Sequence, residues 1–346
     1  MLAAVTEGVG SVTVMERNDP AQPGPAEVLI APEAVGICGS DYHFFLGELS
    51  AAAGGDQFPR VLGHEVGARV VAAGPGCSDR LSPGELVALW PLMACGDCYP
   101  CSVGRANACD NFALIGIHLD GGLQQRLVVP ETQVFPISAQ SPAVAALVEP
   151  LSIAVQAVRR AGVTAGERVV VFGAGPIGQC ICLVARDRGA EVLVVDLQDS
   201  RLPLSAEMGA DTLTWTSADE VIDAAREWGG PGGPAVVFDA TGAAAAVAAM
   251  LQVVASAGRA VQVGMSNHEV PVRIGLLTEK ELDLLGVSCC DRDGFAEAVE
   301  IAERNQRMLE RMVSHRFSLQ RFPEALRFAI DNPTDVLKVV ILGDFD

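Results

Sequence analysis

The pattern of apolar and polar positions divides the chain near residue 150. Before that point short runs of β-branched and apolar residues are separated by Pro-Gly and Gly-Gly pairs; the clearest runs are Glu27–Ile30, Ala68–Ala72 and Gln125–Val129. Short runs bounded by turn-forming residues are typical of strands. The first 150 residues therefore predict a β-rich region with long loops.

Beyond residue 150 continuous apolar runs alternate with helical patterns. Leu151–Ala161 predicts a helix, and Glu167–Phe172 predicts a buried strand. The helical pattern after this strand ends at Gly189, where a C-terminal cap belongs. Further strands are predicted over 191–196, 210–215, 235–240, 259–264 and 281–287, with helices over 218–228 and 243–254. This alternation predicts an α/β fold with a parallel sheet covered by helices on both faces.

The C-terminal part of the chain lacks this alternation. Residues 295–304 and 323–330 predict helices, and 337–342 predicts a closing strand. A length of 346 residues suits about two domains. We therefore expect the tail to return to the first region instead of extending the parallel sheet.

The charge balance and the N-terminus limit the kinds of partner. The formal net charge is −19, with 43 acidic and 24 basic residues, and no basic stripe is visible. Such a chain repels nucleic acid, so no nucleic-acid partner is expected. No apolar run reaches the roughly 18 residues of a membrane span, and the first residues do not resemble a signal peptide. The expectation is a cytoplasmic protein without a membrane partner.

A glycine-rich turn follows the strand that ends at Phe172. Gly173, Gly175 and Gly178 have the G-x-G-x-x-G spacing, with Pro176 and Ile177 between the last two. Such glycines permit a tight turn, close approach of a pyrophosphate and close packing of helix on strand. The turn therefore predicts a dinucleotide site at a helix N-terminus.

The end of the next strand indicates which dinucleotide binds. Asp196 stands eighteen residues after Gly178, where a carboxylate accepts the ribose hydroxyls of NAD and repels a 2′-phosphate. Arg201 is close enough in sequence to reach a 2′-phosphate, so NAD is the prediction and some use of NADP stays open. The ends of later strands complete the predicted cofactor-binding set with Thr241, Val263 and Gly264.

Four of the ten cysteines form one compact cluster. Cys95, Cys98, Cys101 and Cys109 have the spacing C-x2-C-x2-C-x7-C. Four thiolates around Zn²⁺ leave no position for a substrate, so this site is predicted to be structural. An iron–sulfur cluster is the alternative, although the run lacks the usual cluster spacing and proline. Apart from Cys38, the remaining cysteines are expected to be small buried residues: Cys77, Cys180, Cys182, Cys289 and Cys290.

A second set of metal-ligand types is spread along the chain. Cys38 occurs in GICGSDYH, His64 in LGHEVG and Glu149 in LVEPLS. One cysteine, one histidine and one carboxylate leave Zn²⁺ an open position for water or substrate. Each residue alone also fits an ordinary core or capping role.

Together these motifs resemble the zinc-containing medium-chain dehydrogenase family. CGSD, GHE, the four-cysteine lobe, VEPLS and GAGPIG occur in one order over essentially the whole chain. The resemblance implies a GroES-like catalytic domain (1–152 and 290–346) and a Rossmann NAD-binding domain (153–289). It implies two zinc ions per chain, one structural and one catalytic. At the position of Glu149 the simple-alcohol branch often has cysteine, whereas the sorbitol, threonine and sugar-acid branch has glutamate. The resemblance implies Glu65 as an alternative carboxylate ligand.

The resemblance also implies a proton relay. Ser40 would lie beside the substrate oxygen, Asp41 would fix the tautomer of His64, and His43 would pass the proton outward. The expected reaction is hydride transfer between a secondary hydroxyl of a polyol or sugar acid and NAD. His118 is a candidate for contact with a substrate hydroxyl, and Ser288-Cys289-Cys290 replaces the Arg-aromatic pair expected in a sorbitol dehydrogenase.

Three alternatives remain open from the sequence. A threonine-type or simple secondary-alcohol dehydrogenase would share every zinc and NAD residue and differ in the lining of its substrate pocket. An inactive NAD-binding sensor or scaffold would usually lack a zinc ligand or the relay hydroxyl.

The family resemblance further implies a homodimer or homotetramer, formed partly through the edge of the Rossmann sheet.

Overall fold

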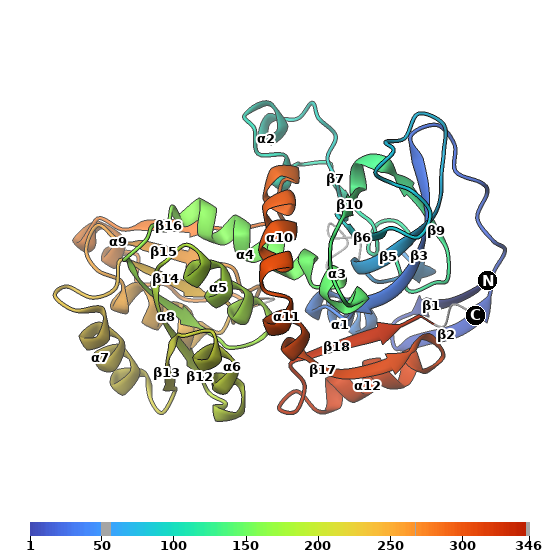
Figure 1. The fold of residues 1–346 in the computed structure, drawn as a ribbon. Coiled ribbons are helices and arrows are strands. Elements are labelled where there is room, and N and C mark those ends of the chain that lie inside the picture. Colours follow the sequence, from blue (N-terminus) through green and yellow to red (C-terminus); the bar gives the residue numbers. More distant parts are fainter. Residues whose placement is uncertain (50–56, 267, 344–346) are drawn as a thin grey trace. The chain divides into compact units, whose positions relative to one another are not determined.

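The structure is a computed structural model that describes residues 1–49, 57–266 and 268–343. The chain divides into two units, each with its own internal contacts. Unit 1 comprises Met1–Glu149 and Cys290–Asp346, and unit 2 comprises Pro150–Cys289. Figure 1 shows the elements of both units.

Unit 1 is built mainly from antiparallel strands, which confirms the β-rich prediction for the first 150 residues. One sheet has the order β2-β1-β4, a second has the order β10-β6-β5-β3-β18-β17 with β9 also paired to β3, and β7 pairs with β8. The strands are β1 (Leu2–Gly8), β2 (Ser11–Glu16), β3 (Glu27–Gly36), β4 (Arg60–Val61), β5 (Glu65–Ala73), β6 (Leu86–Leu89), β7 (Leu92–Met93), β8 (Ala113–Leu114), β9 (Leu127–Pro130), β10 (Val134–Pro136), β17 (Val313–Ser318) and β18 (Lys338–Leu342).

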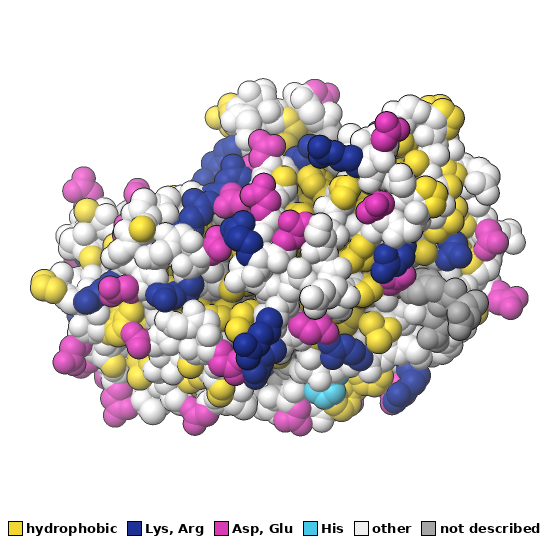
Figure 2. Space-filling model, viewed as in Figure 1, with side chains coloured by type: hydrophobic (Ala, Val, Ile, Leu, Met, Phe, Trp, Pro, Cys, Tyr) yellow, Lys and Arg dark blue, Asp and Glu magenta, His cyan; other side chains and the backbone are white. Residues whose placement is uncertain are grey.

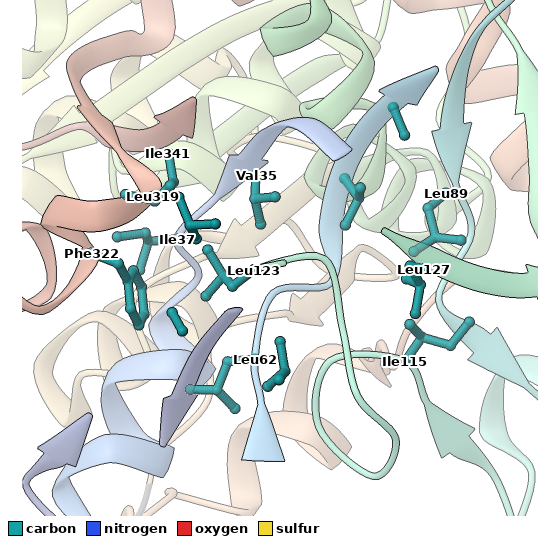
Figure 3. Packing of buried hydrophobic residues seen from close by; sticks show 14 of the residues in the cluster. Val35, Ile37, Leu62, Leu89, Ile115, Leu123, Leu127, Leu319, Phe322 and Ile341 are labelled. Carbon is teal, nitrogen blue, oxygen red and sulfur yellow. The ribbon is translucent and has the colours of Figure 1, made fainter. Parts of the chain in front are cut away.

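The C-terminal strand pairs with a strand from the beginning of the chain. β18 lies antiparallel to β3, with Val340 opposite Gly36, and parallel to β17. The helices of unit 1 are α1 (Gly39–Leu46), α2 (Tyr99–Ser102), α3 (Pro142–Ala146), α10 (Arg292–Arg304), α11 (Gln306–Met312) and α12 (Phe322–Asp331). Leu319 and Phe322 from the tail pack in one apolar core with Val35 and Leu62 (Figure 3). The core therefore joins the two chain segments of unit 1.

The sequence pattern did not predict the hairpin of β1 and β2. Successive residues of β2 are exposed or only half-buried, so the strand has no continuous apolar run. Its register comes instead from pairing with β1, where Leu2 lies opposite Glu16.

Unit 2 contains a six-stranded, fully parallel sheet, as predicted. The strand order is β13-β12-β11-β14-β15-β16. The strands are β11 (Arg168–Phe172), β12 (Glu191–Asp196), β13 (Asp211–Thr214), β14 (Val236–Asp239), β15 (Arg259–Gln262) and β16 (Asp283–Gly286). The helices are α4 (Val148–Ala161), which begins in unit 1, α5 (Pro176–Asp187), α6 (Leu202–Glu207), α7 (Ala218–Gly229), α8 (Ala244–Val253) and α9 (Gly275–Lys280). The α/β fold class is confirmed.

The order of the strands reverses next to β11 in this sheet. The chain runs outward from β11 to β12 and β13, and then returns to add β14 on the other side of β11. Ligands of open parallel sheets bind where the strand order reverses in this way. We therefore expect the loops after β11 and β14 to form the dinucleotide site.

One long apolar helical stretch, Pro142–Ala161, spans α3 and α4. Its 20 residues are apolar enough to cross a membrane by length and composition alone, although Glu149 interrupts the apolar run. However, 78% of its most apolar window is buried inside the protein. That is the pattern of a core helix.

On the face shown in Figure 2, Lys and Arg side chains are interspersed with Asp and Glu side chains.

Candidate active site and metal centres

Cys38 lies at the N-cap of α1, between the end of β3 and the helix. Its backbone is extended (φ −93°, ψ 160°), which turns the chain from strand to helix. The Cys38 N–H donates to the Asp41 carboxylate at 2.8 Å, and the Asp41 N–H donates to the Cys38 carbonyl at 3.1 Å. Asp41 at the third helical position thus fixes the cysteine as a capping carboxylate does.

His64 lies against the same cysteine and the same aspartate. Its Nδ1 is 3.9 Å from Oδ1 of Asp41, and both atoms are buried without a hydrogen-bond partner among the described residues. Burial alone would lower the pKa of His64, but Cys38 and Asp41 outweigh it and raise that pKa well above its ordinary value. Burial raises the pKa of Asp41. Asp41 and His64 are thus neighbours, although 3.9 Å exceeds a hydrogen bond.

Glu65 begins β5 and is held by a lysine that the sequence analysis missed. Lys338 on β18 donates to both carboxylate oxygens of Glu65, at 2.7 and 2.8 Å, and to the carbonyl of Ile37 at 3.1 Å. Both side chains are buried, and Gly36 provides the space, since a Cβ there would lie 2.0 Å from Glu65 Oε2. The sequence does contain a signal for this ion pair, which is the single lysine in the apolar strand LKVVIL. Lysine is rarely buried without a partner, so its presence there indicates a buried acidic partner.

Glu149 lies in the first turn of α4 and is half-buried. Burial raises its pKa to about 7, and the positive charge of His64 opposes this shift. Among the described residues, the ligand atoms of Cys38, His64 and Glu65 lie within 4.8 Å of one another, and Glu149 is not in that group. The structure therefore brings together three of the four predicted ligands and places the fourth within electrostatic reach.

The chemistry of this cluster fits a divalent cation. Two buried carboxylates, Asp41 and Glu65, the half-buried Glu149 and one thiol act on a single lysine and a histidine, so negative groups are in excess. Buried charges are tolerated only when they are paired or coordinate a metal. The unpartnered Nδ1 of His64 facing Asp41 is the arrangement by which a carboxylate orients a metal-binding histidine. Cys, His and carboxylate together are a donor set suited to zinc.

The two remaining relay candidates lie on α1. Ser40 is half-buried in its first turn, next to Asp41. His43 is 40% exposed, and its Nδ1 lies 2.8 Å from Oε2 of Glu48. Ser40 is therefore next to the metal-ligand cluster, and His43 reaches solvent.

The four-cysteine lobe forms a second, separate cluster. The sulfur atoms of Cys95, Cys98, Cys101 and Cys109 lie within 4.8 Å of one another, with individual separations of 3.4, 3.4 and 3.7 Å. Thiolates about 2.3 Å from a tetrahedral zinc stand about 3.8 Å apart, so the lobe fits that ion. The backbone N–H groups of Cys95 and Asn111 donate to the Cys109 sulfur at 3.3 Å.

The glycine-rich turn has the geometry that the motif predicts. Gly173 has a φ of +98°, and a Cβ on Gly178 would lie 1.8 Å from the Gly173 carbonyl oxygen, so both positions require glycine. Gly175 is the N-cap of α5. Pro176 lacks an N–H, while the amides of Ile177 and Gly178 in the first turn have no acceptor within the helix. These amides suit an anion.

Asp196 ends β12 next to this turn. Its Oδ2 accepts from the N–H of Ala174 at 2.6 Å, and its Oδ1 accepts from the N–H of Gln198 at 2.8 Å. Arg201 ends the following turn, and its carbonyl accepts from the buried Gln179 amide at 2.9 Å. The structure thus brings Asp196 to the glycine turn and ties the Arg201 loop to α5.

The other predicted cofactor-binding residues follow β14 and β15. Thr241 is exposed, while Val263 and Gly264 are half-buried. A Cβ on Gly173 would lie 2.7 Å from Thr241 Cγ2, so the loop after β14 touches the glycine turn. All three lie at the carboxyl edge of the sheet.

Two further candidates have local structural roles. His118 Nδ1 accepts from the Leu114 N–H at 3.1 Å, and its ring packs edge-on against Phe112. Burial lowers the pKa of His118. Cys290 is buried, and its carbonyl accepts from the indole N–H of Trp90 at 3.1 Å.

Comparison with known proteins identifies the family. Residues 24–139 match the alcohol dehydrogenase GroES-like domain, and residues 176–304 match the zinc-binding dehydrogenase domain. The chain is 33% identical over 323 residues to L-galactonate-5-dehydrogenase of Escherichia coli K12, with 92% of each chain covered.

Two solved structures share the fold over almost their whole length. A protein of Escherichia coli CFT073 described as a short chain alcohol dehydrogenase, in complex with NADH, is 29% identical with a TM-score of 0.87, and 99% of each chain is covered. A putative zinc-binding dehydrogenase of Sinorhizobium meliloti 1021 bound to NADP is 32% identical with a TM-score of 0.88, covering 99% of this chain and 98% of that one. With a GroES-like region, a parallel dinucleotide-binding sheet and both metal-ligand clusters in one chain, the protein belongs to the zinc-binding alcohol dehydrogenase family.

Proposed function

We propose that the protein transfers a hydride between a secondary hydroxyl of a polyol or sugar acid and NAD. The observation that carries this proposal is the Cys38–His64 pair with the buried Glu65 carboxylate beside it, in a chain that also has the glycine turn of a dinucleotide site. Sugar acids come first among the substrates, because a relative with 33% identity is named for oxidation of L-galactonate at position 5.

Within this proposal Cys38 and His64 hold the catalytic zinc, and Glu149 supplies the carboxylate. Lys338 supports the choice of Glu149, since it binds both oxygens of Glu65 and leaves Glu65 as an alternate ligand. Zinc would supply a Lewis acid that lowers the pKa of the substrate hydroxyl, and the nicotinamide ring would accept the hydride. The four-cysteine lobe would hold a second, structural zinc.

The chain's own residues move the proton. Ser40 would accept the hydroxyl proton beside the metal cluster, and His43, which is 40% exposed, would pass it to solvent. Asp41 would hold His64 in the tautomer that presents Nε2 to the metal. An inactive scaffold would be expected to lack one of these groups, whereas this chain has all of them.

The two units would divide the work of catalysis and cofactor binding. Unit 1 would be the catalytic domain and unit 2 the NAD-binding domain, with Asp196 favouring NAD over NADP. All ten cysteines are free of disulfides, and four of them form a thiol cluster, which suits the reducing cytoplasm.

A substrate panel tests the proposed reaction. We expect NAD-linked oxidation of aldonates and polyols, measured by NADH absorbance, with lower kcat/KM for NADP, 2-butanol and L-threonine. Dialysis against a strong chelator should abolish the activity, because the hydroxyl then lacks its Lewis acid. Full activity in a sample shown to be free of zinc would overturn the proposal, and preference for threonine or 2-butanol would reassign the substrate.

The edge of the parallel sheet suggests how two copies associate. β16 is the last strand of the sheet, and Leu284 on it is 45% exposed, with Val272 (37%) and Ile274 (68%) also exposed in unit 2. An apolar, unpaired edge strand is a template for pairing with another chain. We therefore propose a homodimer formed by pairing of two β16 edges.

Light scattering of the purified protein tests this assembly. At micromolar concentration we expect the mass of at least a dimer, and Leu284→Lys should shift the mass towards a monomer because a charge would be placed in the interface. Leu119→Lys, at a residue that is 42% exposed in unit 1, is the matched control and should leave the mass unchanged. A dimer that survives Leu284→Lys would contradict pairing through this edge.

A further inference from the structure

Asp239 is a buried carboxylate that the reaction described above does not use. It ends β14, is fully inaccessible to solvent, and lies at the carboxyl edge where the strand order reverses. Its side chain is satisfied by N–H and O–H donors. A buried charge of this kind is costly unless it is fully hydrogen-bonded, so its partners indicate what it organises.

The carboxylate gathers donors from the loop after β14 and from the end of β15. Oδ1 accepts from the N–H and the hydroxyl of Thr241, at 3.1 and 2.6 Å. Oδ2 accepts from the N–H of Gly242 at 2.9 Å and from the amide of Gln262, on the neighbouring strand β15, at 2.6 Å. Gln262 also donates to the Gly264 carbonyl at 2.7 Å. The side chain therefore ties the loop after β14 to the loop after β15.

The Asp239 backbone adds to this link, and the two loops are packed without space. Its carbonyl accepts from the N–H groups of Val263 and Gly264, both at 2.9 Å. A Cβ on Gly264 would lie 2.2 Å from the nitrogen of Gly242, and a Cβ on Gly242 would lie 2.0 Å from the Met265 carbonyl oxygen. The backbones of the two loops are thus in direct contact at the carboxyl edge of the sheet.

These bonds determine which polar groups the loops can offer a ligand. The N–H groups of Thr241, Gly242, Val263 and Gly264 all donate to Asp239, and the N–H of Ala243 donates to the Thr241 hydroxyl at 3.0 Å. The Thr241 hydroxyl is itself used as a donor to Asp239. The Ala243 and Gly264 carbonyls already accept, from the Val247 N–H and the Gln262 amide, so the carbonyl oxygens of Thr241, Gly242 and Val263 are the backbone acceptors left for a ligand at this edge of the sheet. It suits hydroxyl and amide donors and does not suit a pyrophosphate.

We propose that Asp239 is a positioning residue for the nicotinamide half of the dinucleotide, a role that rests on the dinucleotide site proposed above. In a doubly wound sheet each half of the dinucleotide lies on one side of the switch point. Asp196 and the glycine turn belong to the side of β11 and β12, which receives the adenosine half. Asp239 shapes the other side, where the ribose hydroxyls and carboxamide N–H₂ of the nicotinamide half meet carbonyl oxygens.

Binding of NADH and of ADP to Asp239→Asn tests this role. The asparagine keeps the size of the side chain but replaces one acceptor by a donor, which then faces the donors of Gly242 and Gln262. By titration calorimetry we expect the Kd for NADH to rise about tenfold or more, while the Kd for ADP, which lacks the nicotinamide half, changes less than about twofold. KM for NAD should rise more than kcat falls. Wild-type protein that bound no NADH would refute the proposed dinucleotide site itself and not the role of Asp239 alone.

Equal losses of NADH and ADP affinity, or no loss of either, would overturn the proposal, since a purely structural residue would give one of these results. If Asp239→Asn does not fold by circular dichroism, Thr241→Val decides instead. Valine keeps the methyl group near Gly173 but removes the hydroxyl between Asp239 and Ala243. We expect the same selective loss for NADH, about fivefold, with recovery in Thr241→Ser. Thr212→Val, at an exposed position on β13, is the matched control; unchanged NADH affinity in Thr241→Val would overturn the proposal.

Discussion

Replacement of Cys38 by serine is expected to reduce kcat/KM by about a thousandfold or more and to remove one of two bound zinc ions. Serine is close to cysteine in size, so the N-cap of α1 and its bonds to Asp41 should survive. A neutral hydroxyl is a much poorer zinc ligand than a thiolate. Loss of an ion that stabilises a developing charge by several kcal/mol removes most of the rate. Steady-state kinetics and metal analysis by mass spectrometry measure both effects.

The control for this variant is Cys77→Ser. Cys77 is a half-buried cysteine of the same unit whose sulfur faces the Glu27 carbonyl at 3.3 Å, away from both metal clusters. We expect it to keep two zinc ions and normal turnover. A Cys38→Ser protein that retained both metals and its activity would show that the Cys38–His64 cluster is not the catalytic centre.

The four-cysteine cluster and the glycine turn could be predicted because their chemistry is local. The four cysteines of the lobe fall within fifteen residues, and the turn from Gly173 to Gly178 is one strand–helix junction. Such spacing is constrained by the ion or the turn itself, so it is visible in one sequence. Cys38, His64 and Glu149 are far apart in sequence, and only the family resemblance joined them.

Residues whose roles depend on sheet register could not be predicted. Lys338 meets Glu65 across 273 residues, because β3 lies between β5 and β18 in the sheet. Asp239 meets Gln262 because β14 and β15 are neighbours with Asp239 opposite Gln262 in the ladder. In the sequence each looked like an ordinary strand residue. Only the order and register of the strands reveal that both are buried polar groups with specific partners.

Replacement of Cys101 by serine is expected to lower stability first and catalysis second. The lobe around the cysteines has short elements, α2 (Tyr99–Ser102) and the turn Ala106–Ala108, and Tyr99 and Val103 on it are exposed. With so little apolar burial, its order depends on the ion. Structural zinc contributes about 10–16 kcal/mol in small zinc-finger peptides, so a lost ligand should release the metal and unfold the lobe. We expect a lower melting temperature and rapid proteolysis near residues 94–112.

Ser102→Ala is the control that distinguishes loss of a metal ligand from a change elsewhere in the same helix. Ser102 lies beside Cys101 in the same helix, and its hydroxyl donates only to the local carbonyl of Tyr99 at 2.8 Å. This control should keep two zinc ions and resist proteolysis. In Cys101→Ser the fraction that remains folded should keep kcat within about threefold, because the ligands of this cluster close the coordination sphere and leave no site for substrate. If Cys101→Ser kept its fold and one zinc but lost turnover, the four-cysteine cluster would hold the catalytic zinc. The proposed roles of the two clusters would then have to be exchanged.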